Sequence, residues 1–202
     1  MKLYFSPGAC SLASNIALRE AGVDFELSKV DPADKTASGG EDFMAINPKG
    51  YVPALKLDDG TVLTENSALL PYIADLNPAA GLAAKAGTIE RYRLQEWLTF
   101  INSEVHKQFS PLFNARTPEA QKEINKAALL KRLGYIEQVL AKQDFLMGSH
   151  FSVADAYLFT VLRWAPKAGL DLAQFPAVQA FMDRVRARPT VAAAINAEKS
   201  AA

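Results

Sequence analysis

The segment KLYFSPGACSLASNIALREAGVDFELSKV, residues 2–30, decides the predicted fold of the first part of the chain. KLYF is a short β-prone run, and SLASNIALREA has a helical pattern that stops at Gly22, a residue typical of helix ends. FELSKV then alternates apolar and polar residues, as a half-buried strand does. A strand, a helix and a second strand in this order favour a parallel strand pair joined by a crossover helix.

The following residues extend this unit with a hairpin and a second helix. Residues 31–51 are rich in turn-forming residues, and we expect them to be irregular. VPALKL and TVLT flank Asp59-Gly60, which is a strong signal for a tight turn between antiparallel strands. ENSALLPYIADL, residues 65–76, has the pattern of a short helix. The first domain, residues 1–80, is therefore predicted to be an α/β unit with a small mixed sheet.

The rest of the chain shows no convincing strand pattern. Residues 77–87 are small and turn-rich, and we assign 81–87 as the linker to an all-helical domain at 88–202. Four helices are expected there, at 88–109, at 118–143 with Pro118 in its first position, at 152–170, and at 177–189 ended by Pro189. The third is apolar throughout, which predicts that it is buried.

Ser152 and Asp155 lie at the start of the third expected helix. Their spacing, S-x-x-D, is a shorter version of the capping box S-x-x-E, in which two side chains satisfy free backbone groups at a helix start. We interpret this pair as a folding element of the second domain and not as a catalytic one.

Composition excludes several classes of protein. The chain has 202 residues, half of them hydrophobic, with 22 basic and 22 acidic residues, so no net charge attracts nucleic acid and no polybasic run indicates a membrane surface. The start MKLYFSPGAC is too short in apolar length for a signal peptide, and no transmembrane run is visible. One cysteine and two distant histidines, His106 and His150, argue against a disulfide scaffold and a metal site. We expect a cytoplasmic protein without a metal.

Five strings occur along the chain in an informative order: SPGACS, NPKGYVPAL, LTENSALLPYIAD, EVHKQFSPLF and FSVADAYLFTVLRWA. Together they resemble bacterial beta-class glutathione transferases, and the resemblance covers almost the whole chain. It implies a thioredoxin-like domain that binds glutathione, followed by a helical-bundle domain. It also implies a homodimer, a site for a hydrophobic electrophile between the two domains, and no resident cofactor, since glutathione serves as co-substrate.

Two pairs of residues in the first domain are candidates for binding glutathione. In thioredoxin-like domains the proline matching Pro53 follows a cis peptide bond, and the backbone of Val52 would then pair with the cysteinyl unit of glutathione. The alternative is an ordinary strand that begins with proline. Glu65 and Asn66 lie at a helix start, where free N–H groups suit a carboxylate and an acidic side chain suits an ammonium. The alternative for this pair is a plain helix cap.

A lysine and one helix face supply the other candidates. The resemblance assigns Lys35 to the glycyl carboxylate of glutathione, although a lone loop lysine is usually only solvated. At 100° per residue, Thr99, Ser103 and His106 share one polar face, with Lys107 at its edge. This face is opposite an apolar arc formed by Leu94, Trp97, Leu98, Ile101 and Val105. The face matches family positions beside glutathione, and the alternative is a solvated surface.

Cys10 and His106 are the residues we expect nearest the glutathione sulfur, with Tyr4 and Ser11 as backups. Cys10 precedes a helix, whose free N–H groups are expected to lower the pKa of its thiol and to favour the thiolate. We therefore expect Cys10 to be sensitive to oxidants and disulfides. Glu104 is expected, on the resemblance alone, to reach the partner's site.

The predicted reaction is attack of the glutathione thiolate on an electrophilic carbon. One alternative is thiol–disulfide exchange or reductive dehalogenation through Cys10, and another is a non-catalytic protein that binds hydrophobic ligands. Four aromatic residues are candidates for the electrophile pocket, and each is equally suited to the core: Phe109, Phe113, Tyr157 and Trp164.

Overall fold

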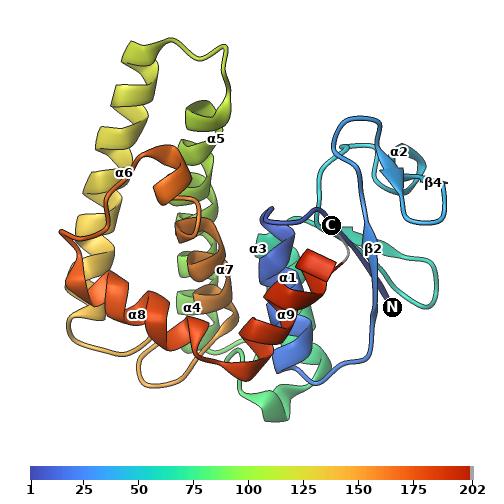
Figure 1. The fold of residues 1–202 in the computed structure, drawn as a ribbon. Helices are drawn as coiled ribbons and strands as arrows, with labels where there is room; N and C mark the ends of the chain where they lie inside the picture. The colour runs from blue at the N-terminus through green and yellow to red at the C-terminus, as the bar shows by residue number, and fades with distance from the viewer. Residues whose placement is uncertain (201–202) are drawn as a thin grey trace. The chain divides into compact units, whose positions relative to one another are not determined.

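The computed structural model describes residues 1–200, which fold into two compact units (Figure 1). The first contains Met1–Ala83 together with the segment from Ala187 onward, and the second contains Ala84–Arg186. The predicted division was 1–80, a linker at 81–87 and a helical domain at 88–202, of which residues 201–202 lie outside the described residues. The structure differs by grouping the C-terminal segment with the first unit.

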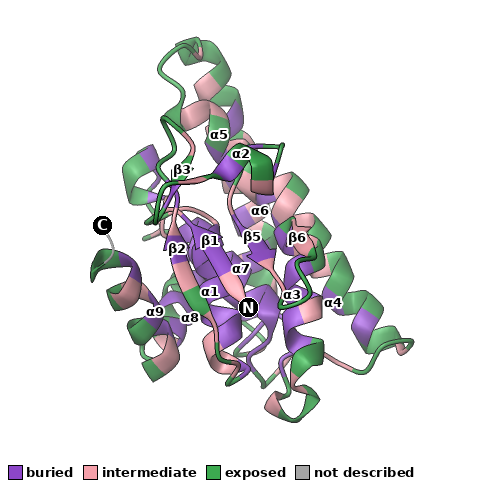
Figure 2. Ribbon diagram, turned by 90° about the vertical axis from the view of Figure 1, so that its right-hand side faces the viewer, coloured by how far each residue is buried: buried purple, intermediate pink, exposed green. Residues whose placement is uncertain are grey.

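The first unit is built on a four-stranded mixed sheet in the order β2-β1-β5-β6. Its strands are β1 (Lys2–Phe5), β2 (Glu26–Lys29), β5 (Ala54–Lys56) and β6 (Val62–Thr64). β1 runs parallel to β2, and the other neighbouring strands are antiparallel (Figure 2). The predicted strand–helix–strand start and the later hairpin are therefore confirmed, and with them the thioredoxin-like first domain.

Helices cover both faces of this sheet. α1 (Ser11–Glu20) and α3 (Asn66–Leu76) lie on one face with α9 (Pro189–Ser200), and α2 (Phe43–Ile46) lies on the other (Figure 1). Beneath α2 a buried cluster forms from Tyr4, Val30, Ala37, Phe43 and Ala54.

The segment 31–51 has more structure than predicted. It contains α2 and a two-stranded sheet of β3 (Thr36–Ala37) and β4 (Glu41–Asp42). These elements are two to four residues long, so their sequences carry no readable period, and Ala37 and Phe43 are held by burial against the sheet.

The C-terminal helix α9 was not predicted. Pro189 was expected to end a helix, but α8 (Pro176–Arg186) ends earlier and Pro189 is the first residue of α9. The physical reason is that proline lacks the N–H that the first turn of a helix leaves without an intrahelical partner. A single proline therefore suits the start of a helix as well as a position beyond its end.

The second unit is helical, as predicted, with different boundaries. Its elements are α4 (Ile89–Phe100), the π-helical turn η2 (Ile101–His106), α5 (Lys107–Phe113), α6 (Glu119–Leu140), α7 (Val153–Leu162), the 3-10 turn η3 (Pro166–Ala168) and α8. A short 3-10 turn, η1 (Pro78–Ala80), lies in the first unit. The expected helix 88–109 is thus interrupted by a π turn. Pro118 has an extended ψ of 145° and caps α6 instead of occupying its first position.

α7 is buried along its whole length, which confirms the prediction from its apolar sequence. Its capping box is also confirmed. Asp155 Oδ2 accepts the Ser152 backbone N–H at 2.8 Å and the Ser152 hydroxyl at 2.7 Å, while Oδ1 accepts the Leu146 N–H at 2.8 Å. Because Asp155 is fully buried, this carboxylate fixes both the start of α7 and the loop before it.

Replacing Asp155 by alanine is expected to lower the free energy of unfolding by about 3 kcal/mol, because two buried backbone N–H groups lose their acceptor. The matched control is Asp183→Ala, which removes an exposed carboxylate paired with an exposed Arg186 and should change the stability by less than about 0.5 kcal/mol. Urea unfolding followed by circular dichroism measures both. Similar losses in the two variants would contradict the role assigned to Asp155.

Candidate functional site

Cys10 ends the turn that connects β1 to α1. The Ala9 N–H donates to the Ser6 carbonyl at 3.0 Å, which closes this turn. The Ser11 hydroxyl donates to the Ser6 carbonyl and accepts the Ser6 N–H, both at 3.3 Å, and Ser11 is fully buried. Ser11, a backup for the catalytic role, therefore uses its hydroxyl to hold the turn that presents Cys10.

The side chain of Asn66 bridges the starts of two helices. Its Oδ1 accepts the hydroxyl of Ser14 in α1 at 2.8 Å, and its Nδ2 donates to the carbonyl of Cys10 at 3.0 Å. Since both ends of the amide are engaged, its backbone N–H at the first residue of α3 is the group suited to an incoming carboxylate.

The Cys10 thiol faces the backbone of Val52. Its Sγ donates to the Val52 carbonyl oxygen at 3.4 Å. The pKa of the Cys10 thiol is raised to about 12, mainly by burial and in addition by the charges of Glu65 and Glu198, while the N–H groups of Cys10 and Ser11 act in the opposite direction. The expected lowering by the helix start is therefore outweighed by burial, although Cys10 as a whole is only half-buried. Cys10 is a neutral S–H donor at neutral pH.

Val52 and Lys35 flank the same loop. The Val52–Pro53 peptide bond is cis, as the resemblance implies. The Cε of Lys35 lies about 3.9 Å from the point where a Cβ on Gly50 would stand. Its side chain thus reaches the loop that leads to Val52.

Glu65 precedes α3 with an unusual backbone. Its φ is 67°, and Lys35 at 63° is the only other non-glycine residue with positive φ among residues 1–200. Such conformations cost about 1–3 kcal/mol and cluster at functional sites. The exposed Glu65 carboxylate accepts a hydrogen bond from Lys49 Nζ at 2.7 Å, and the same Nζ donates to the Thr64 hydroxyl at 2.6 Å.

Tyr4, the other backup, uses its hydroxyl in a bond to β4 and belongs to the buried cluster against which Val52 packs. Its hydroxyl donates to the carboxylate of Glu41 at 3.1 Å, and burial, with Glu41 as the second cause, raises the pKa of Tyr4 to about 12. Tyr4 therefore anchors β4 through Glu41, which agrees with the ordinary strand role considered for it.

The polar helix face predicted in the second unit divides in two. Thr99, Ser103 and Lys107 are exposed, and the Ser103 hydroxyl donates to the Thr99 carbonyl at 2.9 Å. His106 instead is half-buried, with its ring centroid 4.9 Å from that of Trp164. The expectation of one shared face assumed α-helical geometry, and the π turn at 101–106 changes the rotation per residue.

A short hydrogen-bond chain fixes the protonation of His106. The Tyr157 hydroxyl donates to Asn102 Oδ1 at 3.0 Å, so its oxygen accepts from His106 Nδ1, 2.7 Å away. Nδ1 therefore carries the proton, and Nε2 is left as an acceptor. Burial lowers the pKa of His106 to about 4, and the charge of Lys107 acts in the same direction.

The four aromatic candidates for the electrophile pocket are linked to His106 by ring contacts, because Tyr157 and Trp164 contact its ring and the other two contact Trp164. Phe109 stacks on Phe113 with ring centroids 6.1 Å apart. Both rings lie nearly perpendicular to the ring of Trp164, with centroid distances of 5.6 Å for Phe109 and 6.2 Å for Phe113. Tyr157 and Phe109 are fully buried, whereas Phe113 is exposed. Phe113 is thus the candidate best placed to meet a ligand from solvent, and Tyr157 and Phe109 support it from the core.

Glu104, expected to reach a partner's site, has a partner within its own chain. Its Oε2 accepts hydrogen bonds from Nε and Nη2 of Arg132 in α6, at 2.8 and 2.5 Å. The pair ties the π turn to α6, so a contact of Glu104 with a second copy stays a prediction.

Comparison with known proteins identifies the family. A family model described as the glutathione S-transferase N-terminal domain matches residues 8–76, and a model of the C-terminal domain matches residues 100–189. Glutathione S-transferase GstA of Escherichia coli O157:H7 is 50% identical over 98% of each chain. This chain belongs to the glutathione S-transferase family.

Solved structures of glutathione S-transferases agree. A sphingomonad glutathione S-transferase complexed with glutathione superposes with a TM-score of 0.96 at 49% identity, covering 98% of this chain and 99% of that one. The bacterial beta-class glutathione S-transferase of Sphingomonas chungbukensis gives a TM-score of 0.94 at 48% identity over 98% of each chain. The resemblance to the bacterial enzymes, the two-domain fold and the enzyme class are thereby confirmed.

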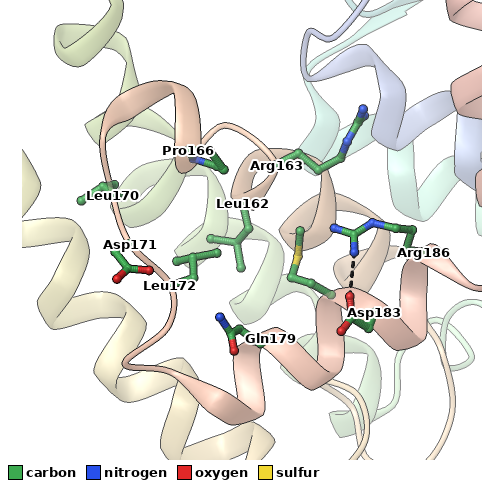
Figure 3. A pocket seen from close by; sticks show the side chains of 10 residues that line it. Leu162, Arg163, Pro166, Leu170, Asp171, Leu172, Gln179, Asp183 and Arg186 are labelled. Atoms are coloured by element: carbon green, nitrogen blue, oxygen red, sulfur yellow. Dashed lines mark hydrogen bonds and ion pairs between the residues drawn. The ribbon is translucent and has the colours of Figure 1, made fainter.

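A separate cavity of about 620 Å³ lies in the second unit of this glutathione S-transferase (Figure 3). Its apolar lining includes Met182 and three leucines, of which Leu162 and Leu172 point toward one another (Figure 3). Its lining holds two arginines and two aspartates, and Arg186 donates to Asp183 at 2.6 Å. Because these charges balance, the cavity is poorly suited to an anion such as glutathione, and it holds none of the predicted site residues.

Residues 1–200 contain no group of three or more His, Cys, Asp and Glu side chains arranged to hold a metal ion. Within the same residues no helix has both the length and the apolar character needed to cross a membrane.

Three residues near the candidates were missed by sequence reasoning: Lys49, Asn102 and Glu198. Lys49 is within the quoted string NPKGYVPAL, so its position beside the site was available as a signal. Asn102 is four residues before His106 and shares a helix face with it, which is a weaker signal. Glu198 lies 190 residues from Gly8, its partner in the turn, and no local pattern indicates that contact.

His106 is expected to stay neutral, with its proton on Nδ1, down to about pH 5. Its pKa of about 4 is below the ordinary 6.5, so the unfolded chain binds more protons between these values. His106 therefore reduces the stability of the fold as the pH falls from 6.5 towards 4. NMR of ¹⁵N-labelled histidine measures the titration, and a His150→Gln variant assigns the two signals. A midpoint above pH 6 for His106 would contradict the hydrogen-bond chain.

Proposed function

We propose that this enzyme conjugates reduced glutathione to small hydrophobic electrophiles. The observation that carries the proposal is the group formed by Cys10, Glu65 and Asn66 at the starts of α1 and α3, with the Val52 carbonyl against the Cys10 thiol, in a chain about half identical to glutathione S-transferases. The complex of the sphingomonad relative with glutathione supports the choice of co-substrate.

Each part of glutathione has a proposed partner in the first unit. The γ-glutamyl carboxylate meets the N–H groups at the start of α3, and the ammonium meets Glu65. The cysteinyl backbone pairs with Val52, and the glycyl carboxylate meets Lys35. The positive φ of Lys35 and Glu65 supports these two assignments, because a fold keeps such conformations only where its surroundings impose them.

The proposed reaction needs a glutathione thiolate and an electrophilic carbon. The sulfur attacks the carbon, a C–S bond forms, and a leaving group such as chloride departs with the electron pair of its bond. The glutathione proton goes to solvent. Cys10, neutral at the pH of the reaction, donates its S–H hydrogen to the glutathione sulfur in place of the Val52 carbonyl, and so favours the thiolate.

The alternatives are less well supported. Thiol–disulfide exchange or reductive dehalogenation through Cys10 requires its thiolate, which a pKa of about 12 makes scarce at neutral pH. A non-catalytic ligand-binding protein has no need of the strained Glu65 or of a thiol held against Val52.

Other parts of the proposal rest on family membership. They are the homodimer, the cytoplasmic location, a role in detoxification and the absence of a resident cofactor. The assignments of His106 to catalysis and of Thr99, Ser103, His106 and Lys107 to glutathione binding also remain predictions. Light scattering tests the homodimer, since a single chain has a mass of 21.9 kDa.

Glu65→Gln is expected to weaken glutathione binding about tenfold or more, because the ammonium loses a charge-assisted hydrogen bond of about 1.5–3 kcal/mol. Isothermal titration calorimetry measures the affinity. The matched control is Glu123→Gln, which removes an exposed, lysine-paired carboxylate from the second unit and should leave the affinity unchanged.

Lys49→Gln adds a second arm to this experiment. Lys49 occupies one oxygen of Glu65 in the structure, so its removal should tighten glutathione binding by roughly two- to fivefold, the range of an exposed ion pair. Unchanged affinity in Glu65→Gln, or weaker binding in Lys49→Gln, would refute the assignment of the ammonium to Glu65.

Cys10→Ala is expected to reduce kcat/KM for a chloronitroaromatic electrophile by about tenfold without abolishing it, because one neutral hydrogen-bond donor is lost. Cys10→Ser retains a donor and should lie closer to the unmodified enzyme. Steady-state kinetics with saturating glutathione decides the matter. Complete loss of conjugation in Cys10→Ala would show that Cys10 does more than donate a hydrogen bond.

A further inference from the structure

One ring nitrogen of His106 is open to solvent. The side-chain hydrogen bond of this residue is made at Nδ1, which lies 2.7 Å from the Tyr157 hydroxyl oxygen. Within residues 1–200, Ser28 Oγ is the one side-chain nitrogen or oxygen that is both buried and without a hydrogen-bond partner. Nε2 of His106 has no partner among those residues, so it is not buried. A molecule that arrives from solvent can therefore reach this nitrogen.

Asn102 and Tyr157 determine what Nε2 offers to such a molecule. The Tyr157 hydroxyl has a single hydrogen, which it donates to Asn102 Oδ1 at 3.0 Å, so its oxygen accepts the hydrogen on Nδ1 of His106. Burial, assisted by the charge of Lys107, lowers the pKa of His106 to about 4, and the ring is neutral at pH 7. A neutral ring with its hydrogen on Nδ1 has a lone pair on Nε2, which can only accept a hydrogen bond.

The turn that carries two of these residues is itself unusual. Asn102 and His106 both belong to the π turn η2, and from there both side chains reach the same Tyr157 hydroxyl in α7. Single π turns within α-helices are rare and occur frequently at functional sites. The turn therefore places the acceptor of the tyrosine hydrogen and the donor to the tyrosine oxygen on one short segment.

The rings beside His106 suit an aromatic ligand. The ring centroid of Trp164 lies 4.9 Å from that of His106, and the Phe113 ring is nearly perpendicular to Trp164 at 6.2 Å. Trp164 is half-buried and Phe113 is 42% exposed, so both retain surface on which another ring can pack edge-on or offset. We call His106, Trp164 and Phe113 the His106 patch. All three belong to the second unit.

An open acceptor within an aromatic patch distinguishes between ligands of similar shape. A ligand that carries an O–H or N–H group can donate to Nε2 while its ring packs on Trp164 or Phe113. A ligand without such a group displaces the water from Nε2 and leaves the nitrogen without a partner, which disfavours its binding. The patch should therefore prefer aromatic molecules that carry a hydrogen-bond donor.

We propose that His106 is a specificity-determining residue that selects aromatic electrophiles carrying an O–H or N–H group, and that Asn102 and Tyr157 are positioning residues that keep its Nε2 an acceptor. The inference rests on the proposed function and deepens it by naming the class of electrophile. The donor group keeps its hydrogen throughout, and the glutathione sulfur attacks the electrophilic carbon as in the proposed reaction.

The first experiment compares two electrophiles that differ in their donor. A chloronitrobenzamide has two N–H hydrogens, and its N,N-dimethyl derivative has none. Each kcat/KM is divided by the rate constant of the uncatalysed reaction with glutathione, which corrects for different reactivity. We expect the unmodified enzyme to prefer the primary amide by about three- to tenfold, the range of one neutral hydrogen bond. His106→Phe keeps an aromatic ring without the acceptor, so the preference should fall by the same factor.

The second experiment tests Asn102 and Tyr157 through the position of the histidine hydrogen. In Asn102→Ala the Tyr157 hydroxyl loses its acceptor and can donate to Nδ1, which moves the histidine hydrogen to Nε2. NMR of ¹⁵N-labelled histidine distinguishes the two forms, and we expect the hydrogen on Nδ1 in the unmodified enzyme and on Nε2 in Asn102→Ala. The preference for the primary amide should disappear with this move. Tyr157→Phe removes the partner of Nδ1 and should also reduce the preference.

The matched control is Tyr135→Phe, which removes the hydroxyl of a half-exposed tyrosine in α6 whose ring contacts Trp97 and Phe100. This variant should keep both the hydrogen on Nδ1 and the preference. A structural role of Tyr157 alone would lower stability without moving the histidine hydrogen, and circular dichroism establishes that each variant is folded.

A histidine hydrogen on Nε2 in the unmodified enzyme would overturn the inference. So would a preference that persists in His106→Phe, or in Asn102→Ala after the hydrogen has moved. The NMR measurement and the comparison of the two amides on the unmodified enzyme need no variant, so they decide the matter even where a variant does not fold. Conjugation of both amides without a preference overturns this inference alone, whereas no conjugation of any chloronitroaromatic compound overturns the proposed function and this inference with it.

Discussion

Asn66 uses its whole side-chain amide to connect the starts of α1 and α3. One end accepts the Ser14 hydroxyl and the other donates to the Cys10 carbonyl, and the residue is nearly inaccessible to solvent. Because a buried amide with one unpaired end is costly, both bonds are retained together or lost together. The bridge sets the distance between the thiol at one helix start and Glu65 at the other. The geometry of the candidate glutathione site depends on it.

Three residues of the first unit have a backbone conformation or a burial that by itself destabilises the fold. Lys35 and Glu65 adopt positive-φ conformations that non-glycine residues usually avoid, and Glu198 occupies a core position with a carboxylate. Natural proteins depart from local rules mainly where function requires it. These three departures all lie in the first unit, whereas the capping box of α7 in the second unit follows the rules closely.

Sequence reasoning succeeded where the signal is local. The strand–helix–strand start, the hairpin at Asp59-Gly60 and the Ser152–Asp155 box each lie within a few residues, and the structure confirms them. It failed where geometry depends on packing. The π turn before Lys107 cannot be read from an apolar period of 3.6 residues, so His106 was expected to share one polar face with Thr99 and Ser103, whereas His106 is half-buried and the other two are exposed. The pKa of Cys10 is determined by enclosure, which a neighbouring helix start does not reveal.

The grouping of α9 with α1 also has a consequence for how the chain is made. The N-terminus leaves the ribosome first, yet Asn15 and Glu20 find their partners in residues 188–198. All of Ala84–Arg186 is synthesised in between, and that unit is continuous in sequence. The contacts within that unit can therefore form during translation. In the first unit, the face of α1 that packs on α9 stays uncovered until α9 has been synthesised. The unit that is begun first is the one that is completed last.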